Sequence, residues 1–298
     1  MRRQKLTVVA LFCVCLSVAI IAFVVFKLTA NSENNTNTSE MQGAQSTGGT
    51  SETTTETSSP TPAPETKDPA FDGAKLQAVV DIWYSSLSSD EKASVVLMNE
   101  DGTLLASVGQ DTSYFTASLY KLFVAYEAYR AIDAGTYDGN ESYLNGSTRS
   151  ECVDLMIRES NSPCGEKWWN ELGKQTIQDQ LKTYGIEHTD MVGLETTAMD
   201  TAMILARIAK GEGLSEESKA KYLDSMKTQP ALYRRGLPSG FSEAVTVYNK
   251  VGWNEQLEWH DATIVERADG ERLIVAVLTS RVGYAKIAEL GKAIETTL

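Results

Sequence analysis

Ser118 and Lys121 stand three residues apart in an apolar stretch that reads FTASLYKLFVAYEAY. This spacing puts both side chains on one face of the helix that the stretch predicts. If Thr116 is the N-cap of that helix, Ser118 lies in the first turn, where free backbone N–H groups stabilise developing negative charge. Because burying an unpaired ammonium group is costly, the lysine in this apolar helix demands an explanation.

A role as proton acceptor for Ser118 would explain the lysine. Loss of hydration and a nearby second cation would lower the pKa of Lys121 towards neutrality, and its neutral amine would then be a general base. The alternative is a lysine that snorkels to the surface beside an ordinary serine. The same spacing recurs from Ser89 and from Ser218, but charged neighbours there indicate solvated helix ends.

The second cation could be Lys250, in the strand-like stretch VYNKVGWNE. Alternation along a strand places Thr246, Tyr248, Lys250 and Gly252 on one face. Gly252 would let another segment approach closely, and Trp253 could offer its backbone N–H to a substrate oxygen. Considered alone, Lys250 would more often be an ordinary solvent-facing lysine.

A third group lies between these two, in MIRESNSPCGEKWWNELG. Ser160, Asn161 and Ser162 follow one predicted helix and precede another. Small hydroxyl and amide side chains at such a junction are usually caps or turn formers. Their catalytic interpretation depends on the other two groups.

The elements that must position these residues follow a definite order. A helix is predicted over residues 74–87, and two strands within residues 93–109 flank Asp101-Gly102, a strong hairpin signal. Residues 116–229 are helical in pattern, strands return at 244–253, 259–267 and 271–280, and residues 284–298 form a closing helix. This order predicts an α+β fold, with one antiparallel sheet of about five strands between the terminal helices and the helical block.

Taken in order, the three groups resemble the signature S-x-x-K, S-D-N and K-T-G of class A β-lactamases and penicillin-binding proteins. The resemblance extends over essentially all of residues 70–298. It implies a β-lactamase-like, three-layer α/β/α fold with a five-stranded antiparallel sheet and a helical subdomain. No cofactor is implied.

The resemblance also implies the catalytic roles. Ser118 would be the acylated nucleophile, with Lys121 as its base. Ser160 would relay the proton to the leaving nitrogen, and Lys250 would hold the substrate carboxylate and bias Lys121 electrostatically. The backbone N–H groups of Ser118 and Trp253 would form the oxyanion hole.

Substrate binding would involve Ser162, Gly252 and Trp253, but two motifs depart from the family pattern. The second motif reads S-N-S, so Ser162 stands where an amide usually contacts the substrate. The third reads K-V-G, so Val251 lacks the hydroxyl that would help to bind a carboxylate.

A further departure concerns the deacylating carboxylate. The segment before LETTAMDTAMILARI contains no clear E-x-x-L-N, the loop that supplies this glutamate in class A enzymes. Glu187 and Glu195 are nearby, but neither has the right sequence context. Acylation is therefore better supported than turnover of a β-lactam.

The cysteines and histidines limit other chemistry. Cys152 and Cys164 flank the second motif and are expected to form a disulfide in an exported domain, the alternative being two separate buried thiols. With only His188 and His260, a three-histidine metal site is impossible, and no zinc-binding spacing is present, so no metal is expected. His260-Asp261 opens a strand and is interpreted as structural.

The N-terminal residues predict export. Residues 6–26 are apolar and uncharged, and basic residues flank them, so residues 1–30 are interpreted as a single-pass anchor with the rest outside the cytoplasm. A cleavable signal peptide is the alternative. Residues 31–69 are rich in Ser, Thr, Glu and Pro and predict a disordered linker.

Charge and motifs together limit the function. The net charge of −13 speaks against nucleic acid as a partner. We expect a monomeric, membrane-tethered serine hydrolase that is acylated at Ser118 by β-lactam or related amide substrates. The alternatives are a penicillin-binding D,D-peptidase acting on peptidoglycan-derived peptides, and a sensing or binding module that does not turn over.

Overall fold

The computed structural model describes residues 71–254 and 257–298. The predicted anchor and linker, residues 1–69, lie outside these described residues. No helix among the described residues combines the length and the apolar character needed to cross a bilayer.

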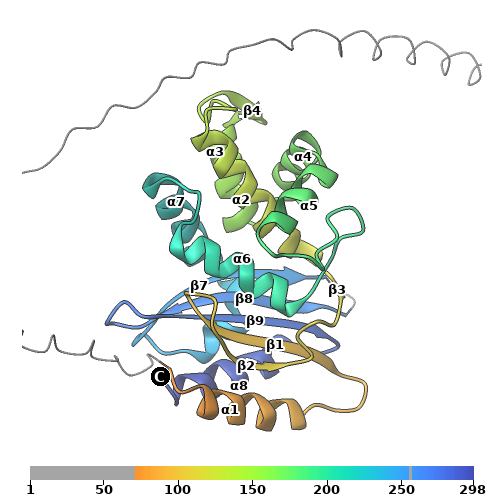
Figure 1. The fold of residues 1–298 in the computed structure, drawn as a ribbon, viewed down its shortest axis with the longest axis vertical. Coiled ribbons are helices and arrows are strands. Elements are labelled where there is room, and N and C mark those ends of the chain that lie inside the picture. The colour runs from red at the N-terminus through yellow and green to blue at the C-terminus, as the bar shows by residue number, and fades with distance from the viewer. Residues whose placement is uncertain (1–70, 255–256) are drawn as a thin grey trace, which may run out of the picture. The chain divides into compact units, whose positions relative to one another are not determined.

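A five-stranded antiparallel sheet forms the centre of the described domain (Figure 1). Its spatial order is β2-β1-β9-β8-β7, and every neighbouring pair is antiparallel. The strands are β1 (Lys92–Asn99), β2 (Leu104–Val108), β7 (Thr246–Trp253), β8 (Trp259–Glu266) and β9 (Arg272–Ser280). This confirms the predicted α+β fold and the antiparallel sheet.

The two predicted Asp-Gly turns connect neighbouring strands of this sheet. Gly102, between β1 and β2, has a φ of +92°, and Gly270, between β8 and β9, has a φ of +86°. Such left-handed backbone favours glycine, which is why these dipeptides were informative in the sequence.

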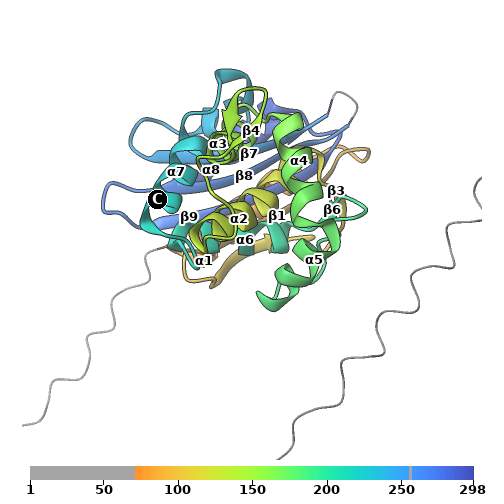
Figure 2. The same cartoon turned by 90° about the horizontal axis from the view of Figure 1, so that it is seen from above.

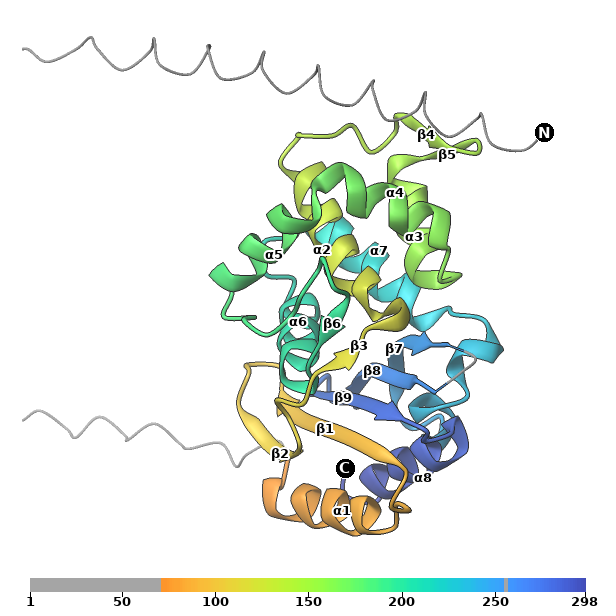
Figure 3. The same cartoon turned by 90° about the vertical axis from the view of Figure 1, so that its right-hand side faces the viewer.

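Helices cover both faces of the sheet, giving three layers (Figures 1 and 3). The terminal helices α1 (Gly73–Ser85) and α8 (Tyr284–Glu295) lie on one face. On the other face lies α6 (Ala198–Lys210), followed outward by the helical block: α2 (Tyr120–Asp133), α3 (Arg149–Arg158), α4 (Ser162–Leu172), α5 (Lys174–Thr183) and α7 (Glu216–Lys227). Figure 2 looks down on this block above the strands.

Burial on both faces explains the continuous apolar runs of the central strands. Along β9, Val275 and Val277 pack with the terminal helices, whereas Ile274 and Ala276 pack with the helical block. The sheet therefore separates two apolar cores.

Several short elements were not predicted. β3 (Tyr114–Phe115) pairs with β6 (Glu195–Thr196), and β4 (Ser142–Leu144) pairs with β5 (Ser147–Thr148). Three 3-10 turns also occur: η1 (Ala117–Leu119), η2 (Ala231–Arg234) and η3 (Leu237–Gly240). Two-residue strands leave no periodic pattern in a sequence, so only tertiary contacts reveal them.

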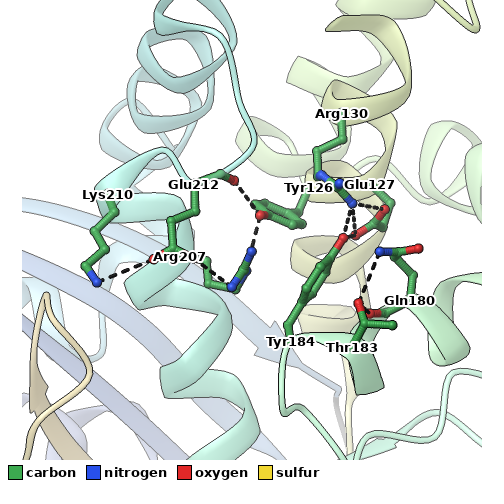
Figure 4. Close-up of polar contacts among 9 residues, drawn as sticks. All are labelled: Tyr126, Glu127, Arg130, Gln180, Thr183, Tyr184, Arg207, Lys210 and Glu212. Carbon is green, nitrogen blue, oxygen red and sulfur yellow. Dashed lines mark hydrogen bonds and ion pairs between the residues drawn. The ribbon is translucent and has the colours of Figure 1, made fainter. Parts of the chain in front are cut away.

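Polar contacts hold the far end of α2 to the neighbouring helices (Figure 4). Tyr184, just after α5, donates from its hydroxyl to Glu127 at 3.0 Å and accepts a hydrogen bond from Arg130. Arg207 of α6 donates to the hydroxyl of Tyr126 at 3.2 Å. These bonds fix the helix whose first turn carries Lys121.

Candidate active site

The turn that carries Ser118 is a 3-10 turn rather than the start of a regular α-helix. η1 spans Ala117–Leu119 and leads directly into α2. Thr116 precedes this turn as predicted, but its side chain makes no capping hydrogen bond, so the predicted N-cap was wrong in that respect. Ala117 has a φ of +44°, a strained conformation for a residue with a Cβ.

Lys121 lies directly behind Ser118 and is 0 % exposed. Its Nζ is 3.0 Å from Ser118 Oγ, 2.7 Å from the carbonyl oxygen of Ser160, 3.2 Å from Ser162 Oγ and 3.4 Å from Ser160 Oγ. An ammonium group has only three N–H donors. In one of the four contacts a hydroxyl can therefore donate to the lysine nitrogen. When the amine is neutral, that donor can be the Ser118 hydroxyl.

Gly165 makes room for this lysine. A Cβ at residue 165 of α4 would lie 3.0 Å from Cε of Lys121 and 3.0 Å from the hydroxyl of Tyr120. Sequence reasoning missed this residue. A glycine inside a predicted helix was the available signal, because such a glycine often has a packing reason.

The turn that carries Ser160 and Ser162 is held by the start of α4. Asn161 is the N-cap and accepts a hydrogen bond from the backbone N–H of Cys164 at 2.9 Å. Cys164 in turn forms the predicted disulfide with Cys152 of α3. Ser160 has a φ of +52°, so this turn, like the one before Ser118, contains left-handed backbone at a residue other than glycine.

Lys250 approaches the same serine from the sheet and is also 0 % exposed. Its Nζ is 3.0 Å from Ser160 Oγ and 2.8 Å from the carbonyl oxygen of Val251. The Ser160 hydroxyl thus lies between the amines of Lys250 and Lys121. The predicted alternation along β7 is confirmed, because Tyr248 packs with the helical block and Val251 packs on the opposite face.

Burial shifts the titration of both lysines. Loss of hydration lowers the pKa of Lys121 to about 8, although the negative charge of Glu166 acts in the opposite direction. Loss of hydration also lowers the pKa of Lys250 well below its usual value, and repulsion from Lys121 adds to this shift. In the described part of the chain no carboxylate is hydrogen-bonded to either amine, and the closeness of the two amines favours loss of a proton near neutral pH.

Gly252 brings the end of β7 against the turn that carries Ser118. A Cβ at this residue would lie 2.8 Å from the carbonyl oxygen of Thr116 and 2.8 Å from Cγ of Leu119. Both contacts are shorter than real Cβ atoms tolerate. The predicted close approach at Gly252 is therefore present, and its partner is the turn that carries Ser118.

His260 of β8 pairs with Gly252 and holds the segment just before the Ser118 turn. Its Nδ1 accepts a hydrogen bond from the backbone N–H of Thr279 at 2.9 Å, so Nε2 carries the proton and donates to the carbonyl oxygen of Phe115 at 2.8 Å. Burial lowers the pKa of His260 to about 4, so the ring is neutral at physiological pH. Sequence reasoning gave His260 a structural role but missed this link to Ser118.

A family model described as Beta-lactamase enzyme family matches residues 74–298, which include the whole arrangement. The chain belongs to the beta-lactamase enzyme family. A comparison with curated proteins found no match.

Solved structures of beta-lactamase-like proteins share this fold. A structure of PBP-A matches with a TM-score of 0.65 at 23% identity, covering 75% of this chain and 95% of PBP-A. A PBP-A mutant in an acyl-enzyme complex with penicillin G matches with a TM-score of 0.63 at 22% identity, over 75% and 95% of the two chains. An ancestral class A β-lactamase matches with a TM-score of 0.68 at 16% identity, over 75% and 100%. At such identities the likeness concerns the fold.

The carboxylates considered from the sequence do not join the site of this beta-lactamase family member. Glu187 is exposed on the chain between α5 and β6. Glu195 is exposed on β6 and accepts a hydrogen bond from the Ser113 hydroxyl at 3.0 Å. Among the described residues, no Asp or Glu oxygen is hydrogen-bonded to Ser118 or Lys121.

The remaining predicted binding residues occupy two different positions. Ser162 is exposed yet contacts Lys121, so it lies at the boundary between the amine and solvent. Trp253 is 37 % exposed, and its ring packs 5.7 Å from the ring of Trp259. Since alternation points the Trp253 side chain away from the Lys250 face, only its backbone can address a substrate beside Ser118.

Metal ligands do not gather in the described part of this beta-lactamase-like domain. Residues 71–254 and 257–298 contain no group of three or more His, Cys, Asp or Glu side chains placed to hold a metal ion.

Proposed function

We propose that this protein is a serine hydrolase that is acylated at Ser118 by β-lactams or related amides. The observation that carries the proposal is the fully buried Lys121, whose amine is 3.0 Å from the Ser118 hydroxyl. The hydroxyl and carbonyl oxygens around it leave its charge uncompensated, which favours the neutral form. The penicillin G acyl-enzyme of a PBP-A mutant, a protein of the same fold, supports this choice of substrate class.

Acylation would proceed by proton transfer along the three side chains. The neutral amine of Lys121 takes the proton of Ser118 as Oγ bonds to the carbonyl carbon of the amide. The developing oxyanion accepts hydrogen bonds from the backbone N–H groups of Ser118 and Trp253. The C–N bond then breaks, and the leaving nitrogen receives the proton through Ser160.

Lys250 would have two functions in this step. Its amine, 3.0 Å from Ser160 Oγ, orients the hydroxyl that relays the proton. Its amine would also donate a hydrogen bond to the carboxylate of a β-lactam or of a peptidoglycan-derived peptide, and the negative charge of that carboxylate would favour the charged form of Lys250. Because Val251 provides no hydroxyl to assist, carboxylate binding would depend more on Lys250 and on Ser162 than in relatives with threonine.

Labelling with a fluorescent penicillin tests this proposal. The full chain should form a covalent adduct that maps to Ser118 and disappears in Ser118→Ala. Ser89→Ala is the matched control, because Ser89 has the same spacing to a lysine but lies in a charged segment. Labelling that survives in Ser118→Ala, or an unlabelled wild-type protein, would contradict the proposal.

A penicillin-binding D,D-peptidase is the second candidate. It is favoured by the lack of a carboxylate hydrogen-bonded to Ser118 or Lys121 in the described residues, since relatives that turn over β-lactams need one for deacylation. A persistent adduct that is released by a D-Ala-D-Ala peptide acceptor would favour this candidate. A persistent adduct without peptidase activity would favour a sensing module.

We also propose that the catalytic domain is exported and tethered to the cell membrane through residues 6–26. Support comes from the length of this apolar segment and its basic flanks. The disulfide between Cys152 and Cys164 fits an oxidising compartment. Fractionation of cells should recover the chain with membranes, and deleting residues 1–30 should release it. Recovery of the full chain in the soluble cytoplasmic fraction would contradict this proposal.

A further inference from the structure

The two backbone N–H groups that the proposed function assigns to the oxyanion lie in different segments. Ser118 lies in η1, and Trp253 is the last residue of β7. Both groups can donate to one oxygen only if the two segments keep a fixed spacing, because each donor must lie about 2.7–3.1 Å from that oxygen. A residue that contacts both segments would set this spacing.

The Trp253 N–H points away from the neighbouring strand. β7 is the outermost strand of the described sheet, beside β8. Hydrogen-bonded and non-hydrogen-bonded pairs alternate along two antiparallel strands. Asn254 donates its backbone N–H to the carbonyl oxygen of Glu258 at 3.3 Å, so the adjacent pair of Trp253 and Trp259 is of the non-hydrogen-bonded kind. The Trp253 N–H is therefore directed to the open edge of the sheet.

The η1 turn has a shape that its surroundings must hold. Ala117, directly before Ser118, has a φ of +44°, and such backbone persists only where outside contacts fix it. Two of these contacts act on Thr116. Its N–H donates to the carbonyl oxygen of Leu194 at 2.7 Å, and its own carbonyl oxygen would lie 2.8 Å from a Cβ at Gly252.

His260 supplies a third contact and reaches both segments at once. Its Nε2 donates to the carbonyl oxygen of Phe115 at 2.8 Å, just before the turn. Its Cδ2 would lie 3.2 Å from a Cβ at Gly252, the residue before Trp253. The ring is fully buried, and its Nδ1 accepts the N–H of Thr279 on β9 at 2.9 Å. The ring cannot turn without breaking one of its two hydrogen bonds, so it holds Phe115 at a fixed distance from the sheet.

We infer that His260 is a positioning residue that sets the spacing of the Ser118 and Trp253 N–H groups, an inference that rests on the proposed function. The carbonyl oxygen of the substrate becomes negative as Ser118 Oγ bonds to the amide carbon, and its hydrogen bonds strengthen in that step. His260 touches no reacting atom. Without its bond to Phe115, the strained Ala117 relaxes and the Ser118 N–H turns away from the oxygen. Acylation then slows, whereas binding of the intact substrate is unchanged.

Two variants separate the hydrogen bonds of His260. His260→Gln places an amide N–H near the position of Nε2 and keeps a donor for Phe115. His260→Asn is shorter, so its amide reaches the N–H of Thr279 as Nδ1 does and leaves the Phe115 carbonyl without this donor. Each variant keeps one buried hydrogen bond and loses the other, so the two should unfold at similar temperatures. His260→Met, which has no donor, takes the place of His260→Asn if that variant does not fold.

Quenched-flow mass spectrometry measures the limiting rate of Ser118 acylation by penicillin G and the dissociation constant of the complex that precedes it. In His260→Asn the limiting rate should fall by about 10–100-fold, less than the 10²–10³-fold of losing an oxyanion donor outright. The dissociation constant should stay within about twofold of wild type, as expected for a contact made only in the transition state. His260→Gln should be acylated within about threefold of the wild-type rate.

The matched control is His188→Gln. His188 is exposed on the chain between α5 and β6, so its replacement should leave the acylation rate within about twofold of wild type.

The infrared band of the acyl-enzyme gives a readout that a loss of stability would not move. With a ¹³C label in the acyl carbonyl of penicillin G, the ester band is recorded while the adduct persists. Hydrogen bonds to a carbonyl oxygen weaken the C=O bond and lower its stretching frequency. The band should therefore move to higher wavenumber in His260→Asn and keep its wild-type position in His260→Gln.

Three results would overturn the inference. They are acylation of the donor-free variant at the wild-type rate, an equal slowing in His260→Gln, and an ester band of the donor-free variant at the wild-type wavenumber. If the wild-type chain forms no Ser118 adduct at all, the proposed function fails together with this inference. If the adduct forms and every His260 variant behaves as the wild type does, this inference alone fails.

Discussion

Acylation of Ser118 should depend on pH through Lys121. Burial lowers the pKa of this amine to about 8. Roughly a tenth of the enzyme then carries the neutral base at pH 7, and roughly a hundredth at pH 6. A lysine with the ordinary pKa near 10.4 would be neutral in only about 0.04 % of molecules at pH 7, so burial raises the active fraction by about two orders of magnitude.

The assay is the rate constant of adduct formation with penicillin G, measured from about pH 6 to about pH 10 at saturating ligand. The logarithm of the rate should rise with unit slope and level off near pH 8. In Lys121→Ala the rate should fall by about 10²–10⁴-fold and lose this slope. Glu166→Gln should move the midpoint to lower pH, because the carboxylate raises the pKa of Lys121.

Two outcomes would refute this reasoning. A rate that keeps rising to about pH 10 would show a lysine with an ordinary pKa, exposed to water. A profile that is the same in Lys121→Ala would show that another group is the base. Thermal unfolding of each variant at each pH checks that the protein is folded throughout.

Three further predictions concern the supports of the site. Gly252→Ala should lower the acylation rate and cost about 1–3 kcal/mol of unfolding free energy, because its Cβ would lie 2.8 Å from the Thr116 carbonyl oxygen. A Gly252→Ala variant that is acylated as fast as the wild type would contradict this. Replacing Cys152 and Cys164 by serine should lower the free energy of unfolding, measured by urea titration, by about 3 kcal/mol, because the disulfide closes a loop with a sequence separation of 12. An unchanged midpoint of the urea titration would contradict this prediction. Burial raises the pKa of Asp261 to about 7, so the folded state holds the proton of this carboxyl more tightly than the unfolded state does. Raising the pH from about 4 to about 7 therefore lowers the free energy of unfolding progressively. Relative to Asp261→Asn, the wild type should lose up to about 4 kcal/mol across that range, and a constant difference would exclude the titration.

The fold could be predicted because its signals are local. The Asp-Gly turns at Gly102 and Gly270 require left-handed backbone, and apolar strand-like runs stand on both sides of each turn. The order of strands and helices along the chain then left few alternative fold topologies. The pairing of β3 with β6 could not be predicted, because two-residue strands depend on contacts between distant segments.

The candidate site was predictable in its residue types but not in its geometry. The sequence singles out Lys121 because a lysine in an apolar helix needs a partner, and it offers Lys250 as the second cation that could lower its pKa. The structure brings both to Ser160. The left-handed backbone at Ala117 could not be foreseen, since it is fixed from outside the turn. Leu194 accepts a hydrogen bond from Thr116 N–H at 2.7 Å, and this contact joins residues far apart in the chain.

The hydroxyl of Ser160 contacts Lys121 from 39 positions away and Lys250 from 90 positions away. Contacts of such long range form late when a chain collapses, after its helices have begun to form. During refolding, helical circular dichroism should therefore recover before any capacity for covalent labelling, because the last strands of the sheet must dock first. A chain that reacts with penicillin would therefore have completed its fold. A secretion or quality-control defect that stops folding early would yield protein with helical circular dichroism that does not react with penicillin.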